Sequence, residues 1–418
     1  MRLRIPQSPA AWSAATLVLG QLALMATSLV FSLSLAYGGG LSAVGSTASA
    51  VLIFQLTVGV LQRSLAEATL LAESHAGHKT DYKTCQWAVG ASLTGGVIGA
   101  LVAIVAALVV PDVDAGLAIA YAAGIPFAIV LDIGRSAGVA AGSPRGAFVE
   151  TAAWLATQMV AMLTFAALHS PLGICLSWAV VNAGFFLLAA AAYAHRRAAF
   201  RGLGQWLGSR RGLLGPATFD AFLVGVTPLL AIQITAFFVS PAVLGAVRIL
   251  QQVYAPLAFV SITLRRVLVY RRKADAAAGA LSDLRDGLVS TALMAVGAVI
   301  IGFAIIGGRE LVPALSFIPV GVALIAAGIE KAALGLSFGT SLSRFVRGEF
   351  SALLQTRYVM LVVTLIAAPL MAARWDAVGY LLGSSLGMVI YSIAVILWPQ
   401  SSRTSGPRQP TPAEPATR

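Results

Sequence analysis

Residue types that carry out covalent chemistry are sparse in this sequence. Its two cysteines, Cys85 and Cys175, allow at most one disulfide, and neither has the spacing of a metal site. Of the four histidines, only His75 and His78 are close neighbours, in a Gly- and Lys-bearing connector typical of a solvated loop. The sequence contains no glycine-rich phosphate loop, no His-Glu metal helix and no Gly-x-Ser-x-Gly elbow. We therefore expect no enzymatic activity, no cofactor and no metal site.

The charged residue best suited to a binding role is Arg248, which lies inside the apolar run 241–262. An arginine in the middle of a membrane helix costs roughly 2.5–3.5 kcal/mol, so it tends to be paired, to face a cavity and to be functional. Its forked guanidinium can bind two diphosphate oxygens at once, whereas an ammonium acts as a point charge. Gln251 and Gln252 follow on the same helix face, and a kink at Pro256 would free a carbonyl.

These residues also have structural explanations. Arg248 lies about two turns from the start of its run, so it could anchor the helix by reaching the outer interface. For Gln251 and Gln252, hydrogen bonds between helices are as good an explanation as contact with a substrate. Asp220, a further candidate for the cavity, lies in the first turn of the run 217–238, where the inner interface or the helix dipole also explains a carboxylate.

Three more residues complete the candidate site. Arg135 and Lys331 lie at the inner ends of two apolar runs and could steer an anionic group inward, although positive-inside anchoring explains them at least as well. Gln55 is a further candidate for lining the cavity. It belongs to a set of intramembrane amides that hydrogen bonds between helices also explain, namely Gln21, Gln55, Gln158, Asn182 and Gln233.

Composition decides what kind of molecule must position these residues. Of the 418 residues, 58% are hydrophobic and 11% are charged, and the mean hydropathy is +0.87. A soluble domain carries roughly 25% charged residues, which it needs for its water-facing surface. A soluble multidomain protein is therefore excluded, and the chain is predicted to be an all-α integral membrane protein.

Apolar runs bounded by charged or turn residues predict about twelve transmembrane helices, each of roughly 20 residues. The first six are 12–36, 41–62, 86–110, 115–137, 147–168 and 171–194, and the second six are 217–238, 241–262, 288–307, 313–336, 350–373 and 376–398. We therefore predict an N-terminal six-helix lobe at 1–195, a basic cytoplasmic connector at 196–216, a C-terminal six-helix lobe at 217–398 and a disordered cytoplasmic tail at 399–418.

The distribution of Lys and Arg predicts the orientation in the membrane. If both termini are cytoplasmic, 25 of the 28 basic residues fall in inner connectors and termini, as the positive-inside rule requires. The net charge of +12 is then a topology signal that also attracts anionic lipid, and we expect a multi-pass cell-membrane protein with no nucleic-acid partner. Cys85 and Cys175 fall near opposite membrane faces, roughly 30 Å apart, so we predict two free thiols.

The chain also repeats itself at an offset near 200 residues. The second helix of each half starts alike, with Leu41-Ser-Ala-Val-Gly45 in one and Ala242-Val-Leu-Gly245 in the other. The fourth helices also end alike, with Asp132-Ile-Gly-Arg135 in one and Gly328-Ile-Glu-Lys331 in the other. Since each half has an even number of spans, the two lobes are predicted to be parallel and related by an axis along the membrane normal.

Part of the second half resembles a known family. The stretch Gly245-Ala-Val-Arg-Ile-Leu-Gln-Gln-Val-Tyr-Ala-Pro256 looks like the eighth helix of actinobacterial polysaccharide-flippase-like proteins, in which a Gly-Ala-x-Arg, a Gln and a following Pro recur. The stretch Val378-Gly-Tyr-Leu-Leu-Gly-Ser-Ser-Leu-Gly387 is similar to the family's last helix, and Arg357 also fits. These proteins belong to the multidrug, oligosaccharidyl-lipid and polysaccharide exporter superfamily. The resemblance covers about forty positions in residues and the whole chain in helix count.

The resemblance implies a V-shaped, two-lobed bundle whose central cavity opens alternately to each side. It also implies that the chain moves a lipid-linked oligosaccharide or polysaccharide precursor from the inner to the outer leaflet. A diphosphate-sugar headgroup cannot cross hydrocarbon unaided, because burial of its charges and hydroxyls without partners costs several kcal/mol. A flippase must therefore line its cavity with cations and amides. The implied partners are a lipid-linked glycan or another amphipathic small molecule, membrane lipids and glycan-assembly enzymes.

Two other functions stay open. A drug or metabolite antiporter of the same superfamily would need an acid that titrates in the cavity, and the first helix, 12–36, contains no Asp or Glu. A non-transporting membrane scaffold with the same fold would have a cavity without polar lining.

Overall fold

The computed structural model describes residues 9–71, 82–110, 113–192, 200–257, 280–347 and 350–398, and every regular element within these ranges is a helix. The predicted tail 399–418 lies outside the described residues, as do the last five residues of the predicted eighth span, 258–262. The N-terminal half comprises α1 (Pro9–Leu61), the π-helix η1 (Gln62–Leu71), α3 (Tyr82–Val109), α4 (Ala115–Ala122), α5 (Ile125–Ala140), α6 (Pro144–Ala167) and α7 (Pro171–Ala192). The C-terminal half comprises α8 (Leu203–Ser209), α9 (Arg211–Thr235), α10 (Pro241–Val253), α12 (Ala280–Gly308), the 3₁₀-helix η2 (Pro313–Phe317), α13 (Val322–Arg347) and α14 (Phe350–Leu397).

The transmembrane character predicted from composition is confirmed. Among the described residues, nine helices are long and apolar enough to cross a membrane. Two of them bend sharply and so supply two crossings each: α1 bends at Gly40, and α14 bends at Trp375 and Asp376. Gly40 has a φ of 75°, a left-handed conformation that glycine adopts without steric cost. With α10 at the place of the eighth span, the helices agree with the twelve predicted crossings.

The predicted bounds of the tenth span, 313–336, are wrong. The sequence predicts a helix over 313–336, but α13 begins only at Val322, after η2 and a turn at Gly321. The apolar residues before Val322 cannot continue a helix, because Pro319 lacks an N–H donor and Gly321 has a φ of 71°. Lys331 therefore lies near the middle of α13, sixteen residues before Arg347, and not at the inner end of its helix.

The predicted connector 196–216 contains helical structure that packs against the N-terminal half. The indole of Trp206 in α8 is buried in a cluster that includes Leu65, Cys85 and Ile133. The guanidinium of Arg210 lies 5.4 Å from the Trp206 ring. The helix α9 then begins at Arg211, six residues before the predicted start of the C-terminal lobe.

The two cysteines are free, as predicted. Cys85 is buried near the start of α3, and Cys175 is buried near the start of α7. The start of α3 lies at the end of the bundle that carries α8, because the ring of Trp87 in α3 lies 6.0 Å from the ring of Trp206 in α8. The start of α7 lies at the opposite end, since α7 follows α6 through a short turn. We call these the α8 end and the Gly40 end of the bundle.

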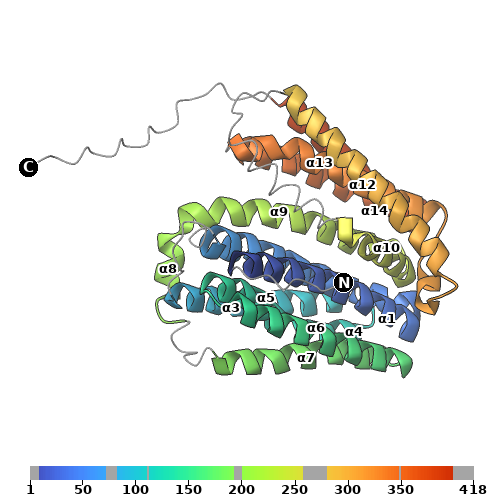
Figure 1. The fold of residues 1–418 in the computed structure, drawn as a ribbon. Helices are drawn as coiled ribbons and strands as arrows, with labels where there is room; N and C mark the ends of the chain where they lie inside the picture. Colours follow the sequence, from blue (N-terminus) through green and yellow to red (C-terminus); the bar gives the residue numbers. More distant parts are fainter. Residues whose placement is uncertain are drawn as a thin grey trace, which may run out of the picture.

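The helices form two layers that diverge towards the α8 end (Figure 1). The N-terminal helices α3 to α7 gather around α1, and α12, α13 and α14 pack against one another in a separate layer. The helices α9 and α10 lie between the layers and both contact α1, while α9 also contacts α14. At the right of Figure 1, the layer of α12, α13 and α14 comes close to α10. At the left, α12 and α13 stand away from α9, while α14 keeps its contact with α9 through Arg357 and Asp220.

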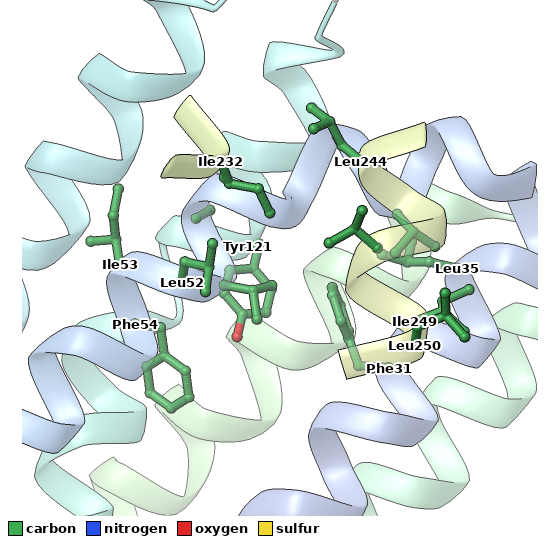
Figure 2. Close-up of a cluster of buried hydrophobic side chains, with 14 of the residues drawn as sticks. Phe31, Leu35, Leu52, Ile53, Phe54, Tyr121, Ile232, Leu244, Ile249 and Leu250 are labelled. Atoms are coloured by element: carbon green, nitrogen blue, oxygen red, sulfur yellow. The ribbon is translucent and has the colours of Figure 1, made fainter. Parts of the chain in front are cut away.

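A hydrophobic core joins the two halves near the Gly40 end (Figure 2). Phe31 and Leu35 come from the first part of α1, and Leu52 and Phe54 come from its second part. They belong to the same buried cluster as Tyr121 from α4, Ile232 from α9 and three residues of α10, Leu244, Ile249 and Leu250. The core therefore attaches α9 and α10 to the N-terminal half at this end.

The glycines that the repeat singles out face each other across the two halves. A side-chain carbon added at Gly45 in α1 would overlap the backbone carbonyl of Pro241. One added at Gly245 in α10 would overlap the backbone carbonyl of Leu41. The contact is therefore reciprocal, with each glycine placed against the start of the other helix. Such a close approach of two backbones is possible only because both positions lack a side chain.

Candidate functional site

A cavity of about 500 Å³ lies between the two halves of the molecule. Its walls come from both parts of α1, from α9 and α10, and from α13 and α14, with Gln62 of η1 at its edge. Part of the wall is hydrocarbon, including Leu24, Met25, Phe54 and Met388. The polar part of the wall is formed by Ser28, Gln55, Gln62, Thr227, Arg248, Gln251, Gln252, Glu330, Lys331, Ser337, Arg357, Thr364 and Ser384.

Arg248 forms one polar cluster on this wall. Its side chain comes from the middle of α10 and is only 3% exposed. The Gln252 amide oxygen, turned towards the guanidinium, accepts from Arg248 Nη2 at 2.5 Å and from Gln55 Nε2 at 3.2 Å. The amide nitrogen of Gln252 then donates to Ser28 Oγ at 2.9 Å. Three of the residues predicted from the sequence thus form one hydrogen-bonded cluster that links α10 to α1.

Glu330 forms a second polar cluster on the same wall. Its carboxylate is 2% exposed and comes from α13. One oxygen, Oε1, accepts from Gln251 Nε2 at 3.1 Å and from Ser384 Oγ at 3.2 Å. The other, Oε2, lies 3.0 Å from Lys331 Nζ. The carboxylate therefore joins α10, α13 and α14, and it holds Gln251 and Lys331 at the cavity.

Asp220 does not belong to the cavity wall, contrary to the prediction. It lies in α9, and its Oδ2 is 2.6 Å from Arg63 Nη1 of η1. Its Oδ1 lies 3.7 Å from Arg357 Nε of α14, and the Arg357 guanidinium stacks 4.4 Å from the centre of the Tyr391 ring. Asp220 is therefore an ion-pair partner that links the N-terminal half to α9 and α14, and Arg357 is the member of this group that reaches the cavity.

Arg135 also lies away from the cavity, in the interior of the N-terminal half. Its guanidinium pairs with Asp132 at 3.2 Å and stacks over the Trp154 ring at 4.8 Å. Asp132 in turn accepts from Gln62 Nε2 at 2.6 Å. A guanidinium that is buried, ion-paired and stacked on an aromatic ring is not placed to steer an incoming headgroup. Lys331, its predicted counterpart, does line the cavity, but in mid-helix and not at the mouth.

The charges of the lining favour an anion. In the described part of the chain, Arg248, Lys331 and Arg357 face the cavity together with one carboxylate, that of Glu330. Cations on the wall of a low-dielectric cleft attract anionic ligands more strongly than they would in water. The amides of Gln55, Gln251 and Gln252 add hydrogen-bonding groups beside them. The lining can therefore hold an anionic, hydroxyl-bearing group against one wall and hydrocarbon against the other.

Glu330 is the site residue that sequence reasoning missed. It was noted only as part of the repeated Gly328–Lys331 segment, although an acidic residue inside an apolar run is itself a signal for a functional site. The absence of Asp and Glu from 12–36 shows only that the first helix supplies no acid to the cavity. The structure brings a carboxylate to the cavity from α13 instead.

No family model and no curated protein sequence matches the chain. Solved structures do share its fold. An inward-facing multidrug resistance MATE family transporter of the MOP superfamily matches with a TM-score of 0.63 and 13% identity, over 92% of this chain and 97% of that one. The lipid II flippase MurJ, in an inward closed conformation, matches with a TM-score of 0.63 and 10% identity, over 92% of this chain and 86% of that one. A MOP superfamily transporter from Pyrococcus furiosus matches with a TM-score of 0.54 and 13% identity, over 93% and 94%. At such identities the likeness is one of fold.

Proposed function

We propose that this chain is a membrane transporter of the MOP superfamily that moves a lipid-linked oligosaccharide or polysaccharide precursor from the inner to the outer leaflet. The observation that carries the proposal is the cavity wall, where three cations and four glutamines accompany one carboxylate among the described lining residues. The shared fold with a lipid II flippase and with a MATE transporter supports transport as the general activity. The implied partners are a lipid-linked glycan, membrane lipids and glycan-assembly enzymes.

We propose that the protein lies in the plasma membrane with its α8 end on the cytoplasmic side. The basic residues of the inner connectors support this orientation. The hydrophobic core joins the halves at the Gly40 end, and α12 and α13 stand away from α9 at the α8 end (Figure 1). We propose that in this conformation the central cavity faces the cytoplasm. Transport would require the Gly40 end to separate while the α8 end closes.

The lining suggests how a diphosphate-sugar headgroup would be held. Arg248 can offer two parallel N–H donors to phosphate oxygens, and Lys331 can add a single charged donor. The amides of Gln55, Gln251 and Gln252 can exchange hydrogen bonds with sugar hydroxyls. These groups would replace the water that the headgroup loses, while the lipid tail stays in the bilayer beside the protein.

A drug or metabolite antiporter is the second candidate, because Glu330 places an acid in the cavity. Antiport needs a group that exchanges a proton or cation for the substrate, and a carboxylate at the cavity can do this. Its carboxylate accepts from Gln251 and Ser384 and pairs with Lys331, and a cationic substrate could take the place of Lys331. A non-transporting scaffold is disfavoured by the polar lining.

Proteoliposomes with the purified full-length protein can separate these functions. A fluorescent polyprenyl-diphosphate disaccharide in the bilayer would report flipping through its protection from a membrane-impermeant quencher. Ethidium efflux driven by a pH gradient would report antiport. The proposal expects flipping in wild type, strong loss in Arg248→Ala and a smaller, partial loss in Glu330→Gln, which weakens the partner of Gln251 and Lys331. Efflux that depends on Glu330, without flipping, would favour the antiporter, and neither activity would favour the scaffold.

A further inference from the structure

A second cavity, of about 560 Å³, lies at the α8 end on the seam between the two halves. It shares no lining residue with the central cavity. One side is formed by the end of α1, by η1 and by α3, and the other side is formed by α8 and the first three turns of α9. We call it the seam groove. Its lining residues are Val60, Leu61, Ser64, Leu65, Ala91, Thr94, Leu203, Leu207, Arg211, Leu214, Gly215, Thr218, Phe219 and Phe222.

The seam groove presents hydrocarbon and one cation. The hydroxyl of Ser64 donates to the Val60 carbonyl at 2.7 Å, and the hydroxyl of Thr94 donates to the Gly90 carbonyl at 3.1 Å. These two hydroxyls are therefore satisfied by backbone carbonyls one turn earlier in the chain, and Thr218 contributes the third hydroxyl of the lining. Among the lining residues that the structure describes there is no Asp or Glu, and Arg211 is the only charged one. The groove therefore matches a ligand with an apolar body and an anionic end.

The charge lies at one end of the groove, at the level where headgroups are expected. Arg211 is exposed and is the first residue of α9, so the positive end of the helix dipole lies there too. Arg210 precedes it, and Arg201 lies at the start of the same connector. Basic pockets between transmembrane helices on the cytoplasmic side are a recurring way of binding anionic lipid headgroups.

The depth of the groove matches one leaflet. Arg211 and Phe222 are eleven residues apart on α9, which corresponds to about 16 Å along the helix. Half of a hydrocarbon core of about 30 Å is about 15 Å. At the far end, Phe219 and Phe222 are 41% and 43% exposed, so this end is accessible from the side of the bundle. An acyl chain that enters with its headgroup at Arg211 would thus span its own leaflet.

We propose that the seam groove binds an anionic phospholipid of the leaflet at the α8 end, with one acyl chain in the groove and the phosphate at Arg211. The proposal does not depend on what the central cavity carries. The groove lies where the N-terminal half meets α9, beside the Arg63–Asp220 pair. A lipid bound there therefore stabilises the conformation in which α9 is packed against the N-terminal half.

The test uses the full-length protein, purified and delipidated in detergent, with native mass spectrometry to count bound lipids. The probes are phosphatidylglycerol and phosphatidylcholine with identical chains. Arg211→Ala removes the headgroup contact. Gly215→Leu fills the groove, since a side-chain carbon at Gly215 meets nothing within 4 Å. The matched controls are Arg309→Ala, on an exposed turn after α12, and Gly184→Leu, at an exposed glycine of α7 that is equally open.

Wild type should bind phosphatidylglycerol about fivefold more tightly than phosphatidylcholine, the factor that one basic residue contributes near an anionic headgroup. Arg211→Ala should reduce phosphatidylglycerol binding to the level of phosphatidylcholine. Gly215→Leu should reduce the binding of both lipids, and the two controls should behave like wild type. Equal binding of the two lipids by wild type would overturn the proposal, as would a preference that survives Arg211→Ala or occupancy that survives Gly215→Leu. Because Arg211 is exposed, its replacement keeps the test decisive even if Gly215→Leu does not fold.

Discussion

At the scale of single residues, Arg248 is the centre of the proposed headgroup site. It is almost fully buried, and it shares the oxygen of Gln252 with Gln55 across the two halves. Arg248→Ala should lower flipping roughly tenfold or more, the factor expected when a hydrogen bond to a charged group is lost. Arg248→Lys should keep partial activity, because an ammonium supplies the charge without the fork. Flipping in proteoliposomes with matched amounts of protein measures both.

Membrane insertion and activity together distinguish a transport role of Arg248 from an anchoring role. Arg248→Ala should not impair insertion, since removal of an intramembrane charge relieves a cost, and Arg248→Lys should insert like wild type, since it keeps the same charge. If Arg248 were an anchor, the Ala variant would be fully active. That result would contradict the proposed role and shift the preference towards the scaffold.

Asp220 carries a second prediction at this scale. It pairs with Arg63 and Arg357, so Asp220→Asn leaves two cations with a weaker partner. Because the Arg63 side chain is 28% exposed, solvent screens part of the interaction, and we expect a loss of about 1–3 kcal/mol in the free energy of unfolding. Thermal unfolding of the purified protein should show a lower midpoint. Asp376→Asn makes the same chemical change at the kink of α14 and should leave the midpoint close to that of wild type. Equal midpoints for all three proteins would mean that the ion pairs do not hold the halves together.

At the scale of elements, the contact between α1 and α10 is the feature most sensitive to conformation. Gly45→Ala or Gly245→Ala would put a methyl group where the carbonyl of Pro241 or Leu41 lies in this conformation. Overpacking costs typically 1–3 kcal/mol, enough to shift a balanced equilibrium about fivefold or more towards a state in which the helices separate.

Spin labels at Gly146 of α6 and Arg285 of α12, both exposed near the α8 end, would report this shift. In wild type the distance between them should be long, and in either alanine variant a shorter population should grow. Gly134→Ala in α5 is the matched control, because a methyl group there meets nothing within 4 Å. An unchanged distance distribution in both Gly45→Ala and Gly245→Ala would show that these glycines do not control the opening of the Gly40 end.

At the scale of the whole molecule, the basic residues predict which end of the bundle is cytoplasmic. Gly204 lies in α8, and Arg374 precedes the kink of α14 at the Gly40 end. Phosphatase and fluorescent-protein fusions after these two residues should therefore report opposite sides of the membrane, with Gly204 inside. The mid-helix position of Lys331 removes one residue from the inner count and leaves the asymmetry intact. The same side for both fusions would contradict the twelve-span arrangement.

The sequence by itself determined the class of the protein, the number of crossings and most of their bounds. These properties are local, because each span must satisfy its own backbone hydrogen bonds and bury its own apolar side chains in lipid. The two free cysteines followed from the same span assignment. The predicted bounds were wrong at 313–336, because hydropathy alone could not show that Pro319 and Gly321 delay the start of α13.

Only the tertiary structure decided which polar residues meet at the cavity. Gln251 and Glu330 are 79 positions apart, and Arg63 and Asp220 are 157 apart, so no local pattern could pair them. Whether a side chain faces lipid, a neighbouring helix or a cavity depends on how its helix is rotated and packed, and hydropathy is nearly blind to that rotation. For this reason the sequence predicted an important arginine at 248, whereas the placement of Arg135 inside the N-terminal half came from packing.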